Sequence, residues 1–567
     1  MSEPAATAVS TALHDGAGDT QRHDDQEATN ASVARATGVI ALGNVASRIL
    51  GMARDVVLTN LFGASTATDA FFVATLVPRT LYDLLIGGHV NGALIPVLSE
   101  VVTRDGRQAL WRLVSVLVSM IAVVMALIVL LLTIFAPTVV SLVGSGYDDA
   151  TRNLAADLLR ITAPAMLFLS LFAILSGTLY ALRAFTFPAL AGAIFNGCVV
   201  LGTVMLAPPL QVFPAASSHG VTWLIDRPIE GIRAAAFGWL IGAGVQMASQ
   251  LPGLRRARLR LTLHWRHPAI RQIVLLYLPV TFSLILDAFV RVFSYNLASQ
   301  TGESSLSYMN WATTLIQFPQ GLVATAISIA ILPTLSRQAA LIAGEGERSF
   351  RDTLGLGLRM AITLIIPAAV GLFVLAVPII DLLFEHGAFT PADTDVTALA
   401  LRLYLIGLPF AAVDLLLVYA FYARQDTLTP ALIGLVSLLL YMVVALLLAP
   451  TTGVFSLMIA DSVKHVAHAL LSTLILHRKL GGFGDQRLAL TTLKAAAAAA
   501  VMVVGALIIQ PVVVDNIDTK RFYGEIFLVG AAGSVCVVVY VAMALLLRLE
   551  ELLWLWRMIR QRLFSRA

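Results

Sequence analysis

Long apolar stretches recur along this chain and limit what it can fold into. About fourteen of them, each of roughly 20 residues or more, lie between Val33 and Leu547. A helix of about 20 apolar residues is long enough to cross the hydrocarbon core of a bilayer. The expected spans are Val33–Phe62, Asp69–Val101, Leu113–Leu142, Ala155–Leu182, Phe187–Ala207, Ala234–Leu251, Ile273–Ser299, Leu306–Ser336, Leu354–Phe384, Val396–Tyr422, Leu428–Leu448, Val454–Leu476, Leu493–Val514 and Ile526–Leu547. We therefore expect an all-α, polytopic membrane protein with about 14 transmembrane helices.

The composition agrees with a chain whose solvent is mostly lipid. Of its 567 residues, 58% are hydrophobic and only 13% are charged, whereas a soluble domain is typically about 25% charged. The net charge of +4 is small and indicates no nucleic-acid partner. Cys198 and Cys536 both lie in apolar runs, so they predict neither a disulfide framework nor a metal site.

The loops between the spans predict the orientation, because lysine and arginine concentrate on the cytoplasmic side. The first and seventh loops carry no such residue, while the sixth is the most basic. Its cations are Arg255, Arg256, Arg258, Arg260, Arg266 and Arg271. The alternation holds along most of the chain; the exceptions are Arg227, Arg233, Lys520 and Arg521. Both termini are therefore expected in the cytoplasm, with an even number of spans.

A short pattern occurs twice and predicts an internal repeat. Ala93–Ser99 reads Ala-Leu-Ile-Pro-Val-Leu-Ser, and Ala330–Ser336 reads Ala-Ile-Leu-Pro-Thr-Leu-Ser. Both precede a predicted cytoplasmic loop, and their separation matches six spans. Two six-helix lobes plus two extra helices fit this spacing, and transporters use such halves to alternate access to a site between them.

The expected organisation follows from the spans and the repeat. It comprises a disordered cytoplasmic tail (1–32), an N-terminal six-helix lobe (33–254), a basic cytoplasmic loop (255–271), a C-terminal six-helix lobe (272–478), two extra transmembrane helices (490–548) and a basic tail (549–567). The first tail has no apolar core and is not a signal peptide. The last tail suits an amphipathic helix on the inner leaflet, or else a solvated end of the last span.

Charges inside the first two spans need an explanation, since each costs at least about 2.5–3.5 kcal/mol at bilayer depth. The first span holds Arg48, Arg54 and Asp55, and the second holds Arg79 and Asp83 at i,i+4. For the two aspartates we favour pairing with neighbouring cations. For Arg48 and Arg54 we favour a role in binding phosphate, because a guanidinium can contact it through two parallel hydrogen bonds.

Charges in the second half are arranged differently. Asp287 and Arg291 lie at i,i+4 in the seventh span and can satisfy one another. Asp461, Lys464 and His465 lie with His468 on roughly one face of the twelfth span. This cluster predicts either an ion or proton relay or a packed polar seam.

Several long motifs resemble the lipid II flippase family (MurJ/MviN). These are Ser47–Asp55 (Ser-Arg-Ile-Leu-Gly-Met-Ala-Arg-Asp), Phe62-Gly-Ala, Ala67–Phe72 (Ala-Thr-Asp-Ala-Phe-Phe), Phe384–Thr394 (Phe-Glu-His-Gly-Ala-Phe-Thr-Pro-Ala-Asp-Thr) and Phe421–Thr427 (Phe-Tyr-Ala-Arg-Gln-Asp-Thr) followed by Thr429-Pro430. The resemblance implies a fourteen-helix fold of the multidrug/oligosaccharidyl-lipid/polysaccharide exporter superfamily. It also implies a bacterial inner-membrane protein whose cationic central cavity carries the pyrophosphate and sugar head group of lipid II from the inner to the outer leaflet.

The resemblance also marks individual residues. Arg48, Arg54 and Asp69 match the family's important positions, but Tyr82 and Thr314 stand where the family usually has cavity arginines. We hypothesise that Arg79, one turn before Tyr82, substitutes for the missing arginine. The candidate substrate-binding residues are Arg48, Arg54, Asp55, Asp69, Arg79 and Tyr82, and the candidate ion or proton relay residues are Asp287 and Asp461.

The family's sodium site requires acids in the seventh and eleventh helices. Asp287 could serve in the seventh, but the eleventh, Leu428–Leu448, has no acid or asparagine. We therefore assign no ion and expect no metal.

Catalytic motifs are missing from this sequence. It contains no HExxH, P-loop, GxSxG or CxxC arrangement, so we expect a transporter without catalytic residues or a cofactor, powered by a gradient or by the membrane potential. The expected partners are lipid II, membrane lipids and other cell-wall synthesis proteins. The alternatives are an exporter of another polyprenyl-linked glycan or amphiphile, a transport-dead cell-wall scaffold, and a polytopic glycosyltransferase. The largest external loop, Pro208–Arg233, offers such an enzyme only Asp226 and Glu230 as acids.

Overall fold

The computed structural model consists of helices joined by short connections. It describes residues 38–87, 90–206, 231–255, 257–262, 268–341, 345–482, 486–519 and 521–552, and no strand occurs within these ranges. The predicted all-α class is confirmed. The N-terminal tail, nearly all of the basic C-terminal tail and most of the loop Pro208–Arg233 lie outside the described residues.

The helices of the first half follow the expected spans. They are a first helix over residues 38–62, α2 (Thr66–Leu85), η2 (Val90–Leu94), α3 (Ile95–Arg104), α4 (Gly106–Ile134), α5 (Ala136–Val143), α6 (Asp149–Thr162), α7 (Ala165–Ala181), α8 (Thr186–Leu206), α9 (Arg233–Ala248) and η4 (Leu251–Leu254). Here η2 is a π-helix and η4 a 3₁₀-helix.

The second half continues in the same way. Its helices are α10 (Pro268–Ser299), α11 (Ser305–Pro319), η5 (Gln320–Thr325), α12 (Ala326–Ala339), α13 (Glu345–Val374), α14 (Ala376–Phe384), α15 (Pro391–Ala423), α16 (Leu428–Thr452) and α17 (Phe455–Leu480). The last two helices are α18 (Leu488–Asn516) and α19 (Phe522–Leu546).

Within the described residues, each expected span overlaps one helix or a run of consecutive helices. Among the described residues, ten helical segments are long and apolar enough to cross a membrane. A polytopic membrane protein is thereby confirmed, while the number of fourteen crossings stays a prediction.

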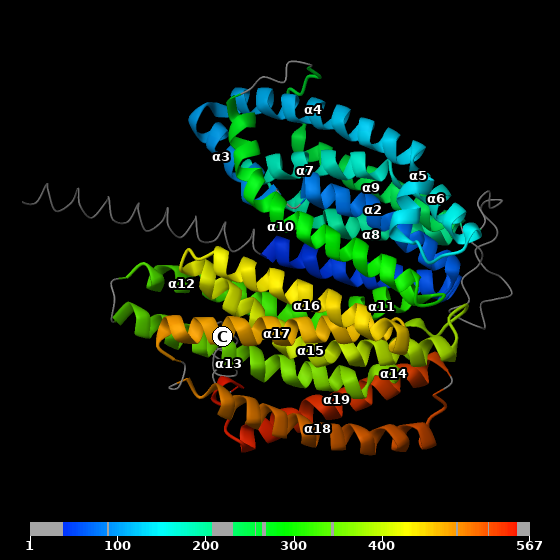
Figure 1. Cartoon of the computed structure of the whole chain (residues 1–567), viewed down its shortest axis with the longest axis vertical. Coiled ribbons are helices and arrows are strands. Elements are labelled where there is room, and N and C mark those ends of the chain that lie inside the picture. The colour runs from blue at the N-terminus through cyan, green and yellow to red at the C-terminus, as the bar shows by residue number, and fades with distance from the viewer. Residues whose placement is uncertain are drawn as a thin grey trace, which may run out of the picture.

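The two halves of the chain form two bodies that repeat one packing pattern (Figure 1). In the first half α9 packs against α7 and α8, and α2 packs against α6. In the second half α17 packs against α15 and α16, and α11 packs against α15. The final pair, α18 and α19, packs on α13 and α14 at the outer edge of the second half. Two lobes plus two extra helices are therefore present.

Two backbone features repeat between the halves and strengthen the case for an internal repeat. The helix α4 breaks at Phe135 (φ −94°, ψ 17°) before the short α5, and α13 breaks at Leu375 (φ −93°, ψ 13°) before the short α14. The turn after α7 places Arg183 at φ 59°, and the turn after α15 places Gln425 at φ 60°.

The same hydrogen bond closes both of these turns. The amide of Ala184 donates to the carbonyl of Leu179 (2.8 Å), and the amide of Asp426 donates to the carbonyl of Phe421 (3.0 Å). Both are left-handed helix ends in which a bond from beyond the helix satisfies a free carbonyl. The residues within the two turns differ, but both turns follow a Tyr-Ala pair (starting at Tyr180 and Tyr422) and precede Pro-Ala-Leu (starting at Pro188 and Pro430), in the same register.

The helix α10 lies between the two bodies. In Figure 1 it runs alongside the helices of the first half. It contacts α2, η2 and α5 of that half and α11 of the other. It also reaches α16, because the hydroxyls of Ser294 and Tyr441 are hydrogen-bonded at 2.7 Å. Its residues can therefore face side chains of either half.

Candidate functional site

A large cavity lies between the two halves of the molecule. Its volume is about 1190 Å³, and its walls come from the first helix, α2, α10, α11, η5 and α12, with single residues of five other helices. The charged residues of this lining are Arg48, Arg54, Arg79, Arg291, Asp55 and Asp461. Because arginines outnumber aspartates two to one among the described lining residues, the cavity attracts anions.

Arg54 is held by neighbours of its own half. Its Nε and Nη2 lie 2.9 and 2.8 Å from Oδ1 of Asp55, and its Nη1 donates to Oδ1 of Asn196 at 3.2 Å. The buried Asp55 also accepts a hydrogen bond from the hydroxyl of Thr314 in α11, at 3.1 Å. Asp55 is thus paired, as we favoured, and it fixes the direction of the Arg54 guanidinium toward the cavity.

Arg48 reaches across to the other half. Its exposed side chain donates from Nη1 to the carbonyl of Gln317 at 3.1 Å. The guanidinium lies over Gly321 in the π-helix η5, where an added Cβ would come within 2.2 Å of Nη2. A glycine at this position therefore gives Arg48 the room it occupies.

Arg79 is the least satisfied cation of the cavity. It is exposed on α2, and it makes no hydrogen bond or ion pair with any residue in the described part of the chain. The i,i+4 pair expected between Arg79 and Asp83 is wrong, because Asp83 pairs with Arg291 instead (Nη1 to Oδ2, 3.3 Å). A free guanidinium in a membrane lobe costs free energy and points to an anionic ligand.

Arg291 lines the cavity, although it is not among the substrate-binding residues predicted from the sequence. Its single ion pair to Asp83 is long, and its Nε is buried without a partner in the described structure. We expected it to pair with Asp287, but these two residues form no ion pair within the described ranges. The sequence does not indicate this position of Arg291, because only the packing of α10 on α2 brings the residue to the cavity.

Tyr82 and Asp287 do not belong to the described lining of the cavity. The Tyr82 ring packs on Gly87, where a Cβ would lie 2.5 Å from the ring. Asp287 is exposed on α10. Asp461, the other candidate relay residue, does line the cavity.

Asp69 lies at one end of the molecule, outside the cavity lining. Its fully buried carboxylate accepts hydrogen bonds from the amide (2.8 Å) and hydroxyl (2.5 Å) of Ser307 and from the hydroxyl of Tyr147 (2.7 Å). Ser307 belongs to the first turn of α11, whose free amides and positive dipole stabilise an anion. Asp69 therefore joins α2 of the first half to α11 of the second.

More contacts close the molecule at this same end, which carries the loops with few cations. The amide of Ala388 donates to the carbonyl of Asn60 at 2.9 Å, and a Cβ on Gly63 would lie 2.3 Å from the carbonyl oxygen of Ala388. The fully buried Trp311 packs edge-on against Phe389, with ring centroids 5.3 Å apart. We call this group of contacts the cation-poor closure.

At the opposite end the cavity lining extends outward. It continues along the first helix to Ala41 and along α12 to Ile329, both of which are exposed. This direction leads toward the basic loops. The cavity is therefore sealed at the cation-poor end and reaches toward the basic end.

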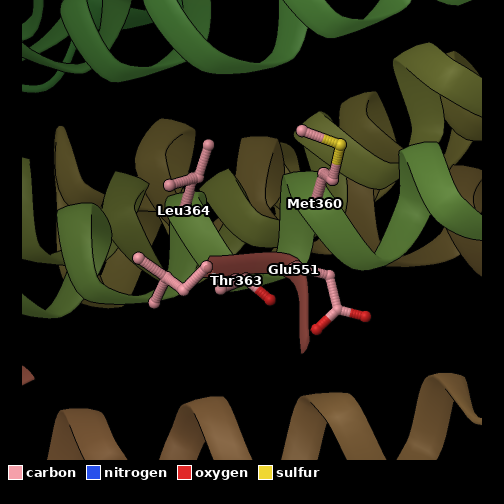
Figure 2. A pocket seen from close by; sticks show the side chains of 5 residues that line it. Met360, Thr363, Leu364 and Glu551 are labelled. Atoms are coloured by element: carbon pink, nitrogen blue, oxygen red, sulfur yellow. The ribbon is translucent and has the colours of Figure 1, made fainter. Parts of the chain in front are cut away.

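A second pocket, at α13, is too small to be a binding site. Figure 2 shows Met360, Thr363 and Leu364 of α13 with Glu551 from the C-terminal segment. Its volume is about 10 Å³, barely room for one water molecule. The nearby Arg359 donates from Nε to Glu551 at 2.7 Å, so this ion pair holds the C-terminal segment against α13.

Comparison with known proteins identifies the family. The family model described as lipid II flippase MurJ matches residues 58–522. The lipid II flippase MurJ of Burkholderia cenocepacia is 30% identical over 441 residues, which cover 76% of this chain and 81% of that protein. The probable lipid II flippase MurJ of Vibrio cholerae is 31% identical over 536 residues, which cover 91% of this chain and 96% of that protein.

Solved structures share the fold. A lipid II flippase MurJ in the inward closed conformation matches with a TM-score of 0.71 at 22% identity, covering 90% of this chain and 98% of that one. An inward-facing multidrug transporter of the MATE family matches with a TM-score of 0.59 at 13% identity, covering 77% of this chain and 96% of the other. Because the family model matches most of its length and the Vibrio cholerae relative is 31% identical over 91% of it, this chain belongs to the lipid II flippase MurJ family.

Proposed function

We propose that this chain moves lipid II from the inner to the outer leaflet of the bacterial inner membrane by alternating access. The observation that carries this proposal is the unpaired Arg79 in a large interlobe cavity with four arginines. The relatives in Burkholderia cenocepacia and Vibrio cholerae are named as lipid II flippases, and this supports lipid II as the transported molecule. The cavity supplies a matching chemistry, because guanidinium groups contact phosphate through parallel hydrogen bonds.

The cavity lining supports a proposal for the substrate contacts. Arg48, Arg54, Arg79 and Arg291 hold the pyrophosphate and neighbouring anionic groups, and Asp55 orients Arg54. Two residues that the sequence analysis included, Asp69 and Tyr82, lie outside the described cavity lining. For Asp69 we propose a role in closing the cavity instead.

The closed end indicates from which side the cavity can be entered in this state. The closure lies at the cation-poor end, and the positive-inside rule favours the outside for such loops. The structure then corresponds to a state closed toward the outside, whose cavity receives substrate from the cytoplasmic side. Both termini are cytoplasmic in this orientation.

The proposed lobes are residues 33–254 and 272–478, joined by the basic loop 255–271 and followed by two further spans within 490–548. The repeated turns at Arg183 and Gln425 support this division. We propose that the lobes rock about the cavity without any catalytic step. Membrane lipids and other cell-wall synthesis proteins are the remaining proposed partners.

A flipping assay tests this proposal. The purified chain is reconstituted into vesicles with fluorescent lipid II, and outward exposure is measured by an impermeant quencher. We expect the wild type to flip lipid II and Arg79→Gln to lose about tenfold or more in rate, in line with a lost charge-assisted contact of about 1.5–3 kcal/mol. Arg112→Gln, which removes an exposed arginine of α4 outside the described cavity lining, is the matched control. A wild type that fails to flip beside a working positive control would refute the proposal.

A second cargo is favoured by one observation. Thr314 occupies a position where the family usually has an arginine, and its short hydroxyl is used by Asp55. A neutral, short side chain leaves room on that wall for a different polyprenyl-linked glycan. Competition of such lipids with lipid II in the same vesicles distinguishes the two cargoes.

A further inference from the structure

Four side chains that end in an amide line the central cavity, and they differ in what they contact. They are Asn44, Asn196, Asn310 and Gln317. Oδ1 of Asn196 accepts a hydrogen bond from Arg54 at 3.2 Å, and Oδ1 of Asn310 accepts one from the Tyr295 hydroxyl at 2.9 Å. The first and last of the four are exposed, and their side-chain amides make no hydrogen bond with any residue that the structure describes. These two amides are therefore available to a ligand, whereas the middle two serve the fold.

Both available amides belong to the surroundings of Arg48. Asn44 precedes Arg48 by four residues in the first helix, a spacing that puts two side chains on one face with their Cβ atoms about 5–6 Å apart. Gln317 comes from α11 of the other half, and its main-chain carbonyl accepts the hydrogen bond from Arg48 at 3.1 Å. The Arg48 guanidinium thus has one free amide beside it from each half of the molecule.

The cavity lining next to these amides is largely apolar. Val45 and Ile49 of the first helix and Leu322 of η5 belong to it, and all three are exposed. Ligand pockets of this kind use a few placed polar groups among apolar side chains to orient the ligand and to give specificity. Asn44 and Gln317 have the position expected of such orienting groups.

The chemistry of an amide side chain indicates what it can bind here. An amide offers donors and an acceptor but no charge, so it adds nothing to the attraction of anions that the arginines provide. A phosphate at neutral pH mainly accepts hydrogen bonds, and a guanidinium is its better partner. Hydroxyl and acetamido groups both donate and accept, and an amide can pair with either of them. The two amides therefore match an N-acetylated amino sugar better than they match a phosphate.

We propose that Asn44 and Gln317 recognise the sugar that is bonded directly to the pyrophosphate of the transported lipid. This inference rests on the proposed function, in which Arg48 holds the pyrophosphate. The first sugar of lipid II follows the pyrophosphate without a spacer. A phosphate bound at Arg48 therefore places this sugar within reach of one amide a helical turn away on the first helix and of another on α11.

The two amides give the cavity a basis for choosing among lipids. A polyprenyl pyrophosphate without a sugar presents the same kind of anionic group to the arginines as lipid II does. The arginines alone therefore discriminate poorly between the two, since specificity is a difference of affinities. Hydrogen bonds to the sugar raise the affinity for the sugar-bearing lipid only. The amides thus favour loading of the cavity with the cargo over loading with a sugar-free carrier.

Binding measurements on the full-length protein in detergent test the inference. Microscale thermophoresis compares three lipids: undecaprenyl pyrophosphate, undecaprenyl-pyrophosphoryl-N-acetylglucosamine, which has a sugar but no peptide, and lipid II. Asn44→Leu and Gln317→Met each replace an amide by an apolar group of similar size. We expect each variant to bind both sugar-bearing lipids about fivefold more weakly, as for one lost neutral hydrogen bond, and to bind the sugar-free lipid like the wild type. Gln108→Met, at an exposed glutamine of α4 outside the described cavity lining, should change none of the three affinities.

The outcomes separate this inference from the proposed function. Wild-type affinity of both variants for the sugar-bearing lipids overturns the sugar contact and leaves lipid II as the cargo. A loss confined to lipid II assigns the amides to the stem peptide, and an equal loss for all three lipids assigns them to the pyrophosphate; either result overturns the inference. A wild type that binds the peptide-free glycolipid but not lipid II, with weaker binding in both variants, supports the sugar contact and removes lipid II as the cargo. Because the two variants lie in different halves, one still decides if the other folds poorly.

Discussion

The Arg48 guanidinium in the first helix donates a hydrogen bond to the main-chain carbonyl of Gln317, 3.1 Å away in the opposite half. A phosphate that takes the Nη1 donor of Arg48 would replace this carbonyl. We therefore expect substrate binding at Arg48 to weaken this contact between the two halves. Gly321 permits the arrangement because it leaves space for the arginine head group.

Gly321→Ala tests this relationship. The new methyl group would displace the end of the flexible Arg48 side chain rather than the backbone, so the protein should still fold. We expect the rate of lipid II flipping to fall about tenfold or more, with the unfolding temperature in detergent nearly unchanged. Gly244→Ala in α9, where a Cβ meets no atom within 4 Å, is the control. Wild-type flipping in Gly321→Ala would show that the position of Arg48 does not matter.

Asp69→Asn should weaken the cation-poor closure. The substitution keeps the shape of the side chain but removes the charge that faces the first turn of α11. A cysteine placed at Asn310 in the cavity should then react faster with an impermeant thiol reagent added outside. Asp395→Asn, which changes an exposed carboxylate near the start of α15, is the matched control. Equal labelling rates in both variants would contradict a closing role for Asp69.

Arg291→Gln should lower the affinity for lipid II about tenfold, because it removes the only arginine that α10 contributes to the described cavity lining. Adding Thr314→Arg to this variant returns a cation to the wall where the family usually places one, and should restore part of the affinity. Binding measured by fluorescence anisotropy of labelled lipid II checks both variants. No loss in Arg291→Gln would mean that Arg291 only pairs with Asp83.

Asp426 predicts a pH dependence of stability at the turn between α15 and α16. Partial burial raises its pKa, but hydrogen bonds from Lys479 and Thr429 outweigh this effect and lower the pKa to about 2. An unfolded aspartate titrates near 3.9, so the stabilisation is complete above about pH 4 and disappears as the pH falls toward 2. The unfolding temperature of the wild type should exceed that of Asp426→Asn at pH 6, and the gap should narrow below pH 4. A gap that stays constant down to pH 3 would contradict the low pKa.

The helices of this fold are readable from the sequence, whereas several of its contacts are not. Apolar stretches of about 20 residues predict where the helices of the described part of the chain lie, since bilayer thickness fixes the length of a span. Two of these contacts could not be read in this way, because Arg291 lies 208 residues from its partner Asp83 and Ser307 lies 238 residues from its partner Asp69. Helical spacing instead suggested local pairs such as Arg79 with Asp83. The periodicity of a sequence predicts which residues share a face of one helix, but it does not predict contacts between helices, and the cavity is lined by residues of many helices.

Asp287 and Asp461 illustrate the same limit from the other side. Both are acids in apolar spans, and the sequence alone treats them alike. Packing separates them, since Asp461 lines the cavity beside Lys464 and His465 while Asp287 stays exposed on α10. The sequence predicts that both residues are acids, but only the packing of the helices determines which of them lines the cavity.

The twin turns at Arg183 and Gln425 have a consequence for how the two halves diverged. Because the two turns keep the same backbone although Arg183 stands where the other has Gln425, the halves can keep a common shape while each has its own set of ionisable residues. Among the described lining residues, the first half supplies three of the four cavity arginines, and the second half supplies Arg291 and Asp461. Two halves with one architecture can thus present different charges on the two walls of the cavity.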